Sequence, residues 1–197
     1  QRVKSLTEKV TAYLEHNNDV RIEKDGQSLT FSIEGRHGIS STGVLVNRGD
    51  SGNLPSGESF IAPIEGTASG KIKVDGSIAD IGILHSPLWL TLEEGRIVKA
   101  EGEAAEALLT LLPTNKSRQL AEFGIGTNDK ARITGVVLED EKVYGTIHLA
   151  FGSNVTFGGQ IEAGVHIDLV IMEPDVYLDG KKFMEKGIPL FPEFTAN

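Results

Sequence analysis

Apolar and polar residues alternate with a period of two along most of this chain, and that period is typical of β-strands with two different faces. The first clear case lies in residues 20–33, where Asp25-Gly26 joins two alternating runs in the manner of a hairpin turn. The other strand-like runs occupy residues 58–102, 118–128, 143–152 and 163–171, and a final hairpin is expected to turn at Asp179-Gly180. The pattern therefore predicts a chain made mostly of short strands.

A helical period is confined to a few segments. At the N-terminus, apolar residues recur at spacings of three and four, at Val3, Leu6, Val10 and Leu14. Residues 101–112 are rich in Ala and Leu and end at Pro113, which predicts a second helix. Residues 137–142 are a candidate for a short third helix, and the Gly-rich passage 35–57 is expected to be a loop containing one strand at residues 43–47. We therefore expect an α+β fold, a single mostly-β domain with two or three helices.

Length and composition are those of an ordinary globular protein, with 197 residues, 39% of them hydrophobic and 24% charged. We expect one domain over residues 1–197, in which residues 1–50 form a helix, a hairpin and a Gly-rich loop region, and residues 58–197 form a β-rich core that carries the site. The chain has no run of about 18 apolar residues and no secretory signal, so we expect a cytoplasmic protein that does not insert into a membrane.

Charge and cysteine content exclude several kinds of partner and site. The net charge of −9 argues against nucleic acid as a partner, because affinity for a phosphate backbone depends on clustered cations. The chain has no cysteine, which excludes disulfides, thiolate nucleophiles and sulfur-ligated zinc. It also has no nucleophile elbow, phosphate-binding loop, dinucleotide fingerprint or H-E-x-x-H motif. Any metal must therefore be held by imidazole and oxygen ligands.

Polar residues interrupt three of the predicted strands. His166 and Asp168 alternate within GVHIDLVIMEP, so both side chains lie on one strand face, with Cα atoms roughly 6.5–7 Å apart. His148 interrupts TIHLAFG in the same way. Glu122 in AEFGIGTN shares its face with two glycines, which we expect to leave space for something other than side chains. Residues of this type on three strands suggest one common site.

A metal ion is one explanation of these buried polar residues. An unpaired carboxylate inside a sheet is costly, and Lys and Arg are nearly absent from the three runs, so Glu122 and Asp168 lack a nearby basic partner. The alternative is structural: a hydrogen-bonded histidine, or an imidazolium–carboxylate pair that stiffens a strand. The remaining histidines have no matching context, and we expect them to be structural or exposed: His16, His37 and His85.

Four segments together resemble the thermophilic metallo-aminopeptidases related to aminopeptidase T and aminopeptidase S. They are NLPSGESFIAPIEG, AEFGIGTN, DEKVYGTIHLAFG and the H-x-D strand, in that order. The resemblance implies a two-metal hydrolase that removes N-terminal residues from peptides, with Zn, Co or Mn as the ion. The ligand set that it implies is Glu58, Glu122, His148, His166 and Asp168. It further implies that Glu58 or Glu122 takes a proton from the attacking water, and that the protein is a homodimer.

The chain departs from that family in two ways. The family has a tyrosine ligand at a position near Val155, where this chain has no tyrosine, so the number of ions is one or two. Family members also carry an N-terminal domain that these 197 residues lack. Two alternatives follow: a non-haem Fe(II) ring-cleaving dioxygenase of the same superfamily, with His148, His166 and Asp168 as its 2-His-1-carboxylate set, or a non-catalytic oligomerising domain whose metal site is vestigial.

Overall fold

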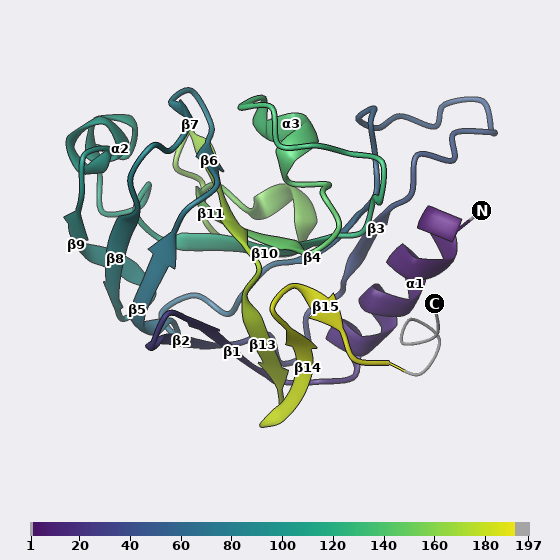
Figure 1. Ribbon diagram of the computed structural model, residues 1–197, viewed down its shortest axis with the longest axis horizontal. Coiled ribbons are helices and arrows are strands. Elements are labelled where there is room, and N and C mark those ends of the chain that lie inside the picture. Colours follow the sequence, from purple (N-terminus) through teal and green to yellow (C-terminus); the bar gives the residue numbers. More distant parts are fainter. Residues whose placement is uncertain (1, 192–197) are drawn as a thin grey trace.

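The computed structural model describes residues 2–191 of the chain (Figure 1). Within that range it contains three α-helices: α1 (Arg2–Glu15), α2 (Ala105–Leu111) and α3 (Val137–Asp140). The described residues otherwise form two antiparallel sheets, so the expected α+β fold, mostly β with three helices, is confirmed. No helix within residues 2–191 is long and apolar enough to cross a membrane.

The larger sheet has eight strands among the described residues, in the order β15-β14-β13-β1-β2-β5-β8-β9. Their bounds are β1 (Asp19–Lys24), β2 (Gln27–Ser32), β5 (Ser69–Val74), β8 (Leu88–Glu93), β9 (Arg96–Glu101), β13 (Asp175–Leu178), β14 (Lys181–Glu185) and β15 (Ile188–Pro189). The predicted hairpin turns at Asp25-Gly26 and Asp179-Gly180 join β1 to β2 and β13 to β14, so both predictions are confirmed. At each turn the backbone of both residues is left-handed, which Asp and Gly tolerate better than most residues.

The smaller sheet carries the polar strands and has seven members within residues 2–191, in the order β3-β4-β10-β11-β12-β6-β7. Their bounds are β3 (Ile39–Ser41), β4 (Glu58–Ile61), β6 (Ser77–Ile78), β7 (Gly82–Ile83), β10 (Leu120–Gly126), β11 (Thr146–Gly152) and β12 (His166–Met172). All residues of the central strands β10 and β11 are buried on both faces of the sheet. Any polar side chain on these two strands must therefore find its partners inside the protein.

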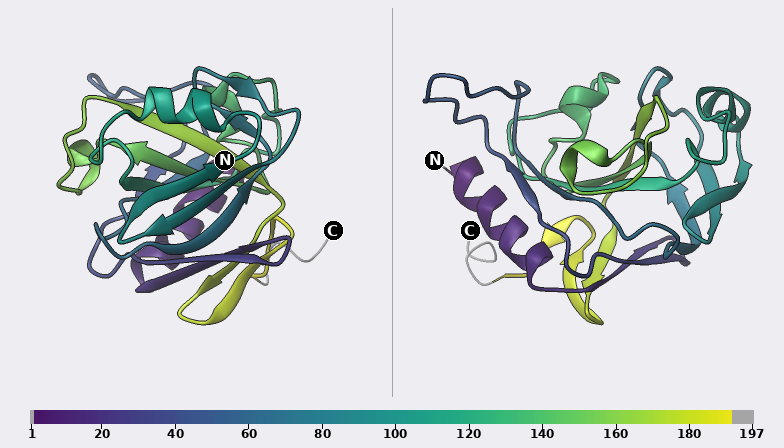
Figure 2. Two further views of the ribbon diagram at one scale, coloured as in Figure 1. Left: turned by 90° about the vertical axis from the view of Figure 1, so that its left-hand side faces the viewer. Right: turned by 180° about the vertical axis from the view of Figure 1, so that it is seen from behind.

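The hydrophobic core lies between the two sheets, which cross one above the other in Figure 2. Phe31 from β2 and Phe123 from β10 meet in it edge to face, with ring centroids 5.4 Å apart. The apolar residues that alternate with the polar ones on β11 and β12 lie in this core: Ile147, Leu149, Phe151, Ile167, Leu169 and Ile171. Because strand side chains alternate, the other face of the smaller sheet points away from this core.

One strand prediction is wrong. Residues 43–47 do not form a strand, and the short β3 lies just before them instead. The apolar side chains of this segment are exposed, Val46 most of all at 78%. β-branched residues favour a strand only where a neighbouring strand and a buried face are available, and this loop offers neither.

Helix α1 covers the edge of the smaller sheet next to β3 (Figure 1). Its apolar stripe, Leu6, Val10 and Leu14, is buried as predicted. Beside that stripe, the Thr11 hydroxyl lies 2.6 Å from Ser40 Oγ and 2.7 Å from Ser59 Oγ. Buried hydroxyls that satisfy one another fix the helix against β3 and β4, and so fix the strand that begins with Glu58.

Candidate metal centre

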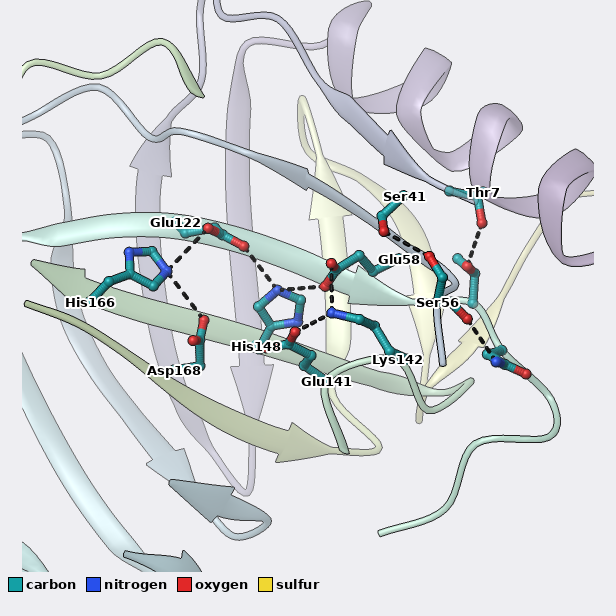
Figure 3. A network of polar contacts seen from close by, with 12 residues as sticks. Thr7, Ser41, Ser56, Glu58, Glu122, Glu141, Lys142, His148, His166 and Asp168 are labelled. Atoms are coloured by element: carbon teal, nitrogen blue, oxygen red, sulfur yellow. Dashed lines mark hydrogen bonds and ion pairs between the residues drawn. The ribbon is translucent and has the colours of Figure 1, made fainter. Parts of the chain in front are cut away.

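The candidate site occupies the face of the smaller sheet that points away from the core, and its residues come from four adjacent parts of that sheet (Figure 3). The structure brings together all five residues named from the sequence: Glu58 at the start of β4, Glu122 on β10, His148 on β11, and His166 and Asp168 on β12. Their side chains form a row across the strands. The sequence prediction of a shared site is therefore consistent with the geometry.

Each of the five faces a small residue on a neighbouring strand. The pairs in register are Glu58 with Gly126, Glu122 with Ala150, His148 with Gly124, Asp168 with Ala150, and His166 with Gly152. Directly opposed side chains in an antiparallel sheet stand about 4.5–5.5 Å apart at Cβ, so a bulky residue there would occupy the same space. The alternation of polar and small residues is what allows five polar side chains to lie in one layer.

Gly124 shows this requirement most sharply. A Cβ atom placed on Gly124 would lie 2.0 Å from His148 Nε2 and 2.1 Å from His148 Cε1. The expectation that the glycines beside Glu122 leave room for something other than side chains is therefore wrong for Gly124, because the imidazole of His148 fills that space. The glycine is needed for the histidine on the next strand.

Glu122 lies at the middle of the row, between the two imidazoles. His148 Nε2 is 3.1 Å from Glu122 Oε1, and His166 Nε2 is 3.3 Å from Glu122 Oε2. His166 Nε2 is also 3.4 Å from Asp168 Oδ1. On its other side, His166 Nδ1 donates to the Ser153 carbonyl at 2.8 Å, so its Nε2 is the nitrogen directed at the carboxylates.

A second set of charges lies at the β4 end of the row. Glu58 Oε2 is 3.4 Å from His148 Nε2, and Glu58 Oε1 accepts a 2.7 Å hydrogen bond from Lys142 Nζ. Lys142 Nζ also bonds to Glu141, and both residues are buried. Glu141 and Lys142 directly follow α3, which packs near β12 and β6. The position of helix α3 therefore places the Glu141 carboxylate and the Lys142 ammonium group at the sheet face.

The charged groups of the row shift one another's pKa values strongly. Burial opposes the charged imidazole of His148, but Glu122, Glu58 and Glu141 outweigh it and raise the pKa of His148 to about 9. Burial likewise opposes charge on His166, yet Asp168 and Glu122 raise its pKa to about 11. Burial would raise the pKa of Glu122, but its bonds to both histidines lower it to about 2. The carboxylates of the row thus favour the protonated form of both imidazoles.

The two outer carboxylates behave differently from Glu122. Burial raises the pKa of Glu58 above its ordinary value, against the pull of His148 and Lys142. Burial also raises the pKa of Glu141, to about 7. Burial opposes charge on Lys142, but Glu58 and Glu141 hold the pKa of the ammonium above its usual range. The lysine is therefore a permanent cation at neutral pH.

The ligand atoms and spacing of the carboxylates and imidazoles in the row are suited to binding a metal ion. Their atoms form two groups within residues 2–191, Glu122–His166–Asp168 and Glu58–Glu141–His148, and in each group the potential ligand atoms lie within 4.8 Å of one another. In the described part of the chain, Glu58 Oε2, Asp168 Oδ1 and His148 Nδ1 are buried without a hydrogen-bond partner. Carboxylate oxygens and imidazole nitrogens are donors that Zn, Co and Mn accept, and buried carboxylates that converge need a cation beside them. A bound ion would displace the imidazole protons.

Sequence reasoning missed Glu141 and Lys142. They lie in a segment without a clear period. Lys142 is a basic residue of the site, and it pairs with Glu58 and Glu141 and not with Glu122 or Asp168. The only signal was the acidic run that ends in a lysine just before the His148 strand. The other three histidines are exposed, as predicted: His16, His37 and His85.

The segment near Val155, where the resemblance would place a tyrosine, is a single 3-10 turn over Val155–Phe157. It places an aromatic ring against the site: Phe157 packs edge to face on His166, with centroids 5.8 Å apart. Two of the three tyrosines are engaged elsewhere: Tyr13 stacks on Phe191 and Tyr177 lies under Arg21.

Carboxylates and imidazoles that converge from adjacent strands on a buried sheet face are typical of metalloproteins that use nitrogen and oxygen ligands. The chain belongs to the thermophilic metalloprotease (M29) family, whose model matches residues 1–193. The resemblance stated from the sequence is thus confirmed. The chain is also 26% identical over 210 residues to aminopeptidase AmpS of Bacillus subtilis (strain 168). That match covers 95% of this chain and 51% of the relative, so the chain spans about half the relative's length.

Two solved structures share the fold. The 2,5-dihydroxypyridine dioxygenase of Pseudomonas putida KT2440 superposes with a TM-score of 0.89 at 21% identity, covering 99% of this chain and 61% of that one. Wild-type AmpT from Thermus thermophilus superposes with a TM-score of 0.75 at 23% identity, covering 93% of this chain and 53% of that one. At such identities the likeness concerns the fold alone.

Proposed function

We propose that this chain is the metal-bearing part of a metal-dependent aminopeptidase, which removes N-terminal residues from peptides. The observation that carries the proposal is the row of carboxylates and imidazoles on one sheet face, centred on Glu122. Membership of a metalloprotease family and similarity to a relative named as an aminopeptidase support it. The expected cofactor is Zn, Co or Mn, as one or two ions held by Glu58, Glu122, His148, His166 and Asp168.

Bound ions would polarise the scissile carbonyl and lower the pKa of a water molecule. The chain's own residues supply the rest. Glu58 or Glu122, both buried carboxylates of the row, would take a proton from the attacking water. His166 and Asp168, the two partly exposed members of the row, mark the end from which a peptide would approach.

The test is release of free amino acids from Leu- and Phe-headed peptides by the metal-free chain after Zn²⁺, Co²⁺ or Mn²⁺ is added back. We expect Glu122→Gln to abolish release, because the amide cannot neutralise both imidazoles or hold an ion as a carboxylate does. The matched control is Glu94→Gln, at a hairpin turn, where the side chain is 84% exposed. Full activity in the Glu122→Gln variant would show that the proposed site is wrong.

One observation favours a second candidate, a mononuclear Fe(II) dioxygenase: the dioxygenase structure superposes over more of the chain than AmpT does. The site favours the peptidase, because His148 and His166 flank Glu122 and do not converge with Asp168 on one point. Metal analysis after anaerobic purification separates the two. One Fe per chain would support the dioxygenase, and Zn, Co or Mn would support the peptidase. A homodimeric assembly remains part of the proposal, to be checked by light scattering.

A further inference from the structure

The two groups of potential ligands differ in whether they already contain a cation. Lys142 is fully buried, and its Nζ bonds to two of the three members of the Glu58–Glu141–His148 group. Among the described residues, the two carboxylates of the Glu122–His166–Asp168 group form ion pairs only with imidazoles, those of His148 and His166. With neutral imidazoles and ionised carboxylates, as in a metal-bound site, the first group together with Lys142 carries a net charge of about −1, and the second carries about −2.

Charge and access both favour the lysine-free group. A divalent ion matches its two carboxylates, whereas an ion entering the Glu58 group would lie within a few ångströms of an ammonium that is already bonded to both carboxylates. The Lys142 side chain has no exposed surface, so it cannot move into solvent without local opening. His166 and Asp168, in contrast, are 30% and 16% exposed, which gives an ion a route to their group.

We propose that Lys142 determines the order of metal loading, by holding the Glu58–Glu141–His148 group as an internal ion pair so that the first ion binds at Glu122–His166–Asp168. The inference rests on the proposed function and refines it. Lys142 acts as a fixed positive charge in place of a second ion, and Glu141 is its partner on the side away from Glu58 (Figure 3). Occupation of the second group requires displacement of the ammonium from both carboxylates.

The experiment is a calorimetric titration of the metal-free chain with Zn²⁺ alone, together with metal analysis after dialysis. We expect one tightly bound ion per chain and a second ion bound at least about a hundredfold more weakly, given the strength of a buried charge contact. Asp168→Asn should remove the tight event, whereas Glu141→Gln should leave it unchanged. These results would place the first ion at the Glu122–His166–Asp168 group.

The decisive variant is Lys142→Met, which keeps the length of the side chain and removes its charge. We expect the weak event to tighten by about tenfold or more, with the tight event unchanged. The control is Lys24→Met, which removes an ammonium that is largely buried and bonded to Asp75 at 3.0 Å, outside the site; its titration should match wild type. The wild-type titration decides the question alone if Lys142→Met does not fold.

Two ions of equal affinity in the wild-type chain, or an unchanged second event in Lys142→Met, would overturn this inference and leave the proposed function standing. A chain that binds no Zn²⁺ at either group would overturn both. Because binding is measured without a peptide substrate, peptidase activity does not enter the result.

Discussion

Phe123 and Gly124 are neighbours on β10, and they illustrate opposite demands on the two faces of one sheet. Phe123 points into the core between the sheets, where it is fully buried against Phe31. Gly124 points to the other face, where even a methyl group would collide with His148. One face is stable because it is filled with large apolar groups, and the other holds the site because small residues alternate with polar ones.

The difference separates stability from chemistry along the same strands. Loss of volume on the core face leaves a cavity, whereas gain of volume on the site face displaces a ligand. Substitutions at adjacent positions should therefore have different consequences. The three predictions below test this separation, in order of the expected change in stability.

Phe123→Ala should give the largest loss of stability, about 3–5 kcal/mol of unfolding free energy, because a large buried ring is removed from a packed core. Chemical denaturation followed by tryptophan fluorescence and circular dichroism would measure it. Zn²⁺ bound per folded chain should stay unchanged, since Phe123 contributes nothing to the site face. Val98→Ala on β9, where the side chain is 54% exposed, is the control and should change stability by less than about 0.5 kcal/mol.

Gly124→Ala should show the reverse pattern. The added methyl group would lie 2.0 Å from His148 Nε2, so the imidazole must move. We expect the free energy of unfolding to fall by about 1–3 kcal/mol because the layer is overpacked. We also expect Zn²⁺ affinity to fall by about ten- to a hundredfold, as is usual when the groups that orient a metal ligand are changed. A Zn²⁺ titration beside a denaturation curve measures both.

The control for this change is Gly52→Ala, in an exposed loop where an added Cβ meets only Leu45 at 3.5 Å. That variant should bind Zn²⁺ like wild type. If Gly124→Ala also binds like wild type, the glycine does not position His148, and the two faces do not differ as described.

The strands of both faces could largely be predicted, because alternation is a local property of the sequence. The apolar series of β11 and β12 indicated the core face, and His148, His166 and Asp168 marked the other. The Asp-Gly pairs fixed two hairpins through their tolerance of left-handed backbone. Residues 43–47 show the limit: their strand propensity was real, but the fold provides no partner strand for them.

The composition of the site was harder to predict, since it depends on contacts between distant segments. The register that sets Gly124 opposite His148 follows from pairing β10 with β11 across 24 residues, and no local signal gives it. Glu141 and Lys142 reach the site because α3 packs near β12. Glu58 was named through family resemblance and not through its own pattern. Periodicity predicts which way a side chain points, but it does not predict which side chains meet.

Phe157→Leu should have the smallest effect, and it tests whether the site face depends at all on aromatic packing. Phe157 lies edge to face on both Phe60 and His166, with centroids 5.6 and 5.8 Å away. Leu keeps apolar volume but loses these ring contacts, so we expect a loss of about 0.5–1.5 kcal/mol. Zn²⁺ affinity should fall by less than about tenfold, because the hydrogen bond from His166 Nδ1 to Ser153 still orients the imidazole. Val155→Ala, in the same turn and 49% exposed, is the control. A loss of Zn²⁺ binding in Phe157→Leu as large as that in Gly124→Ala would show that aromatic packing, and not only small opposing residues, holds the ligands in place.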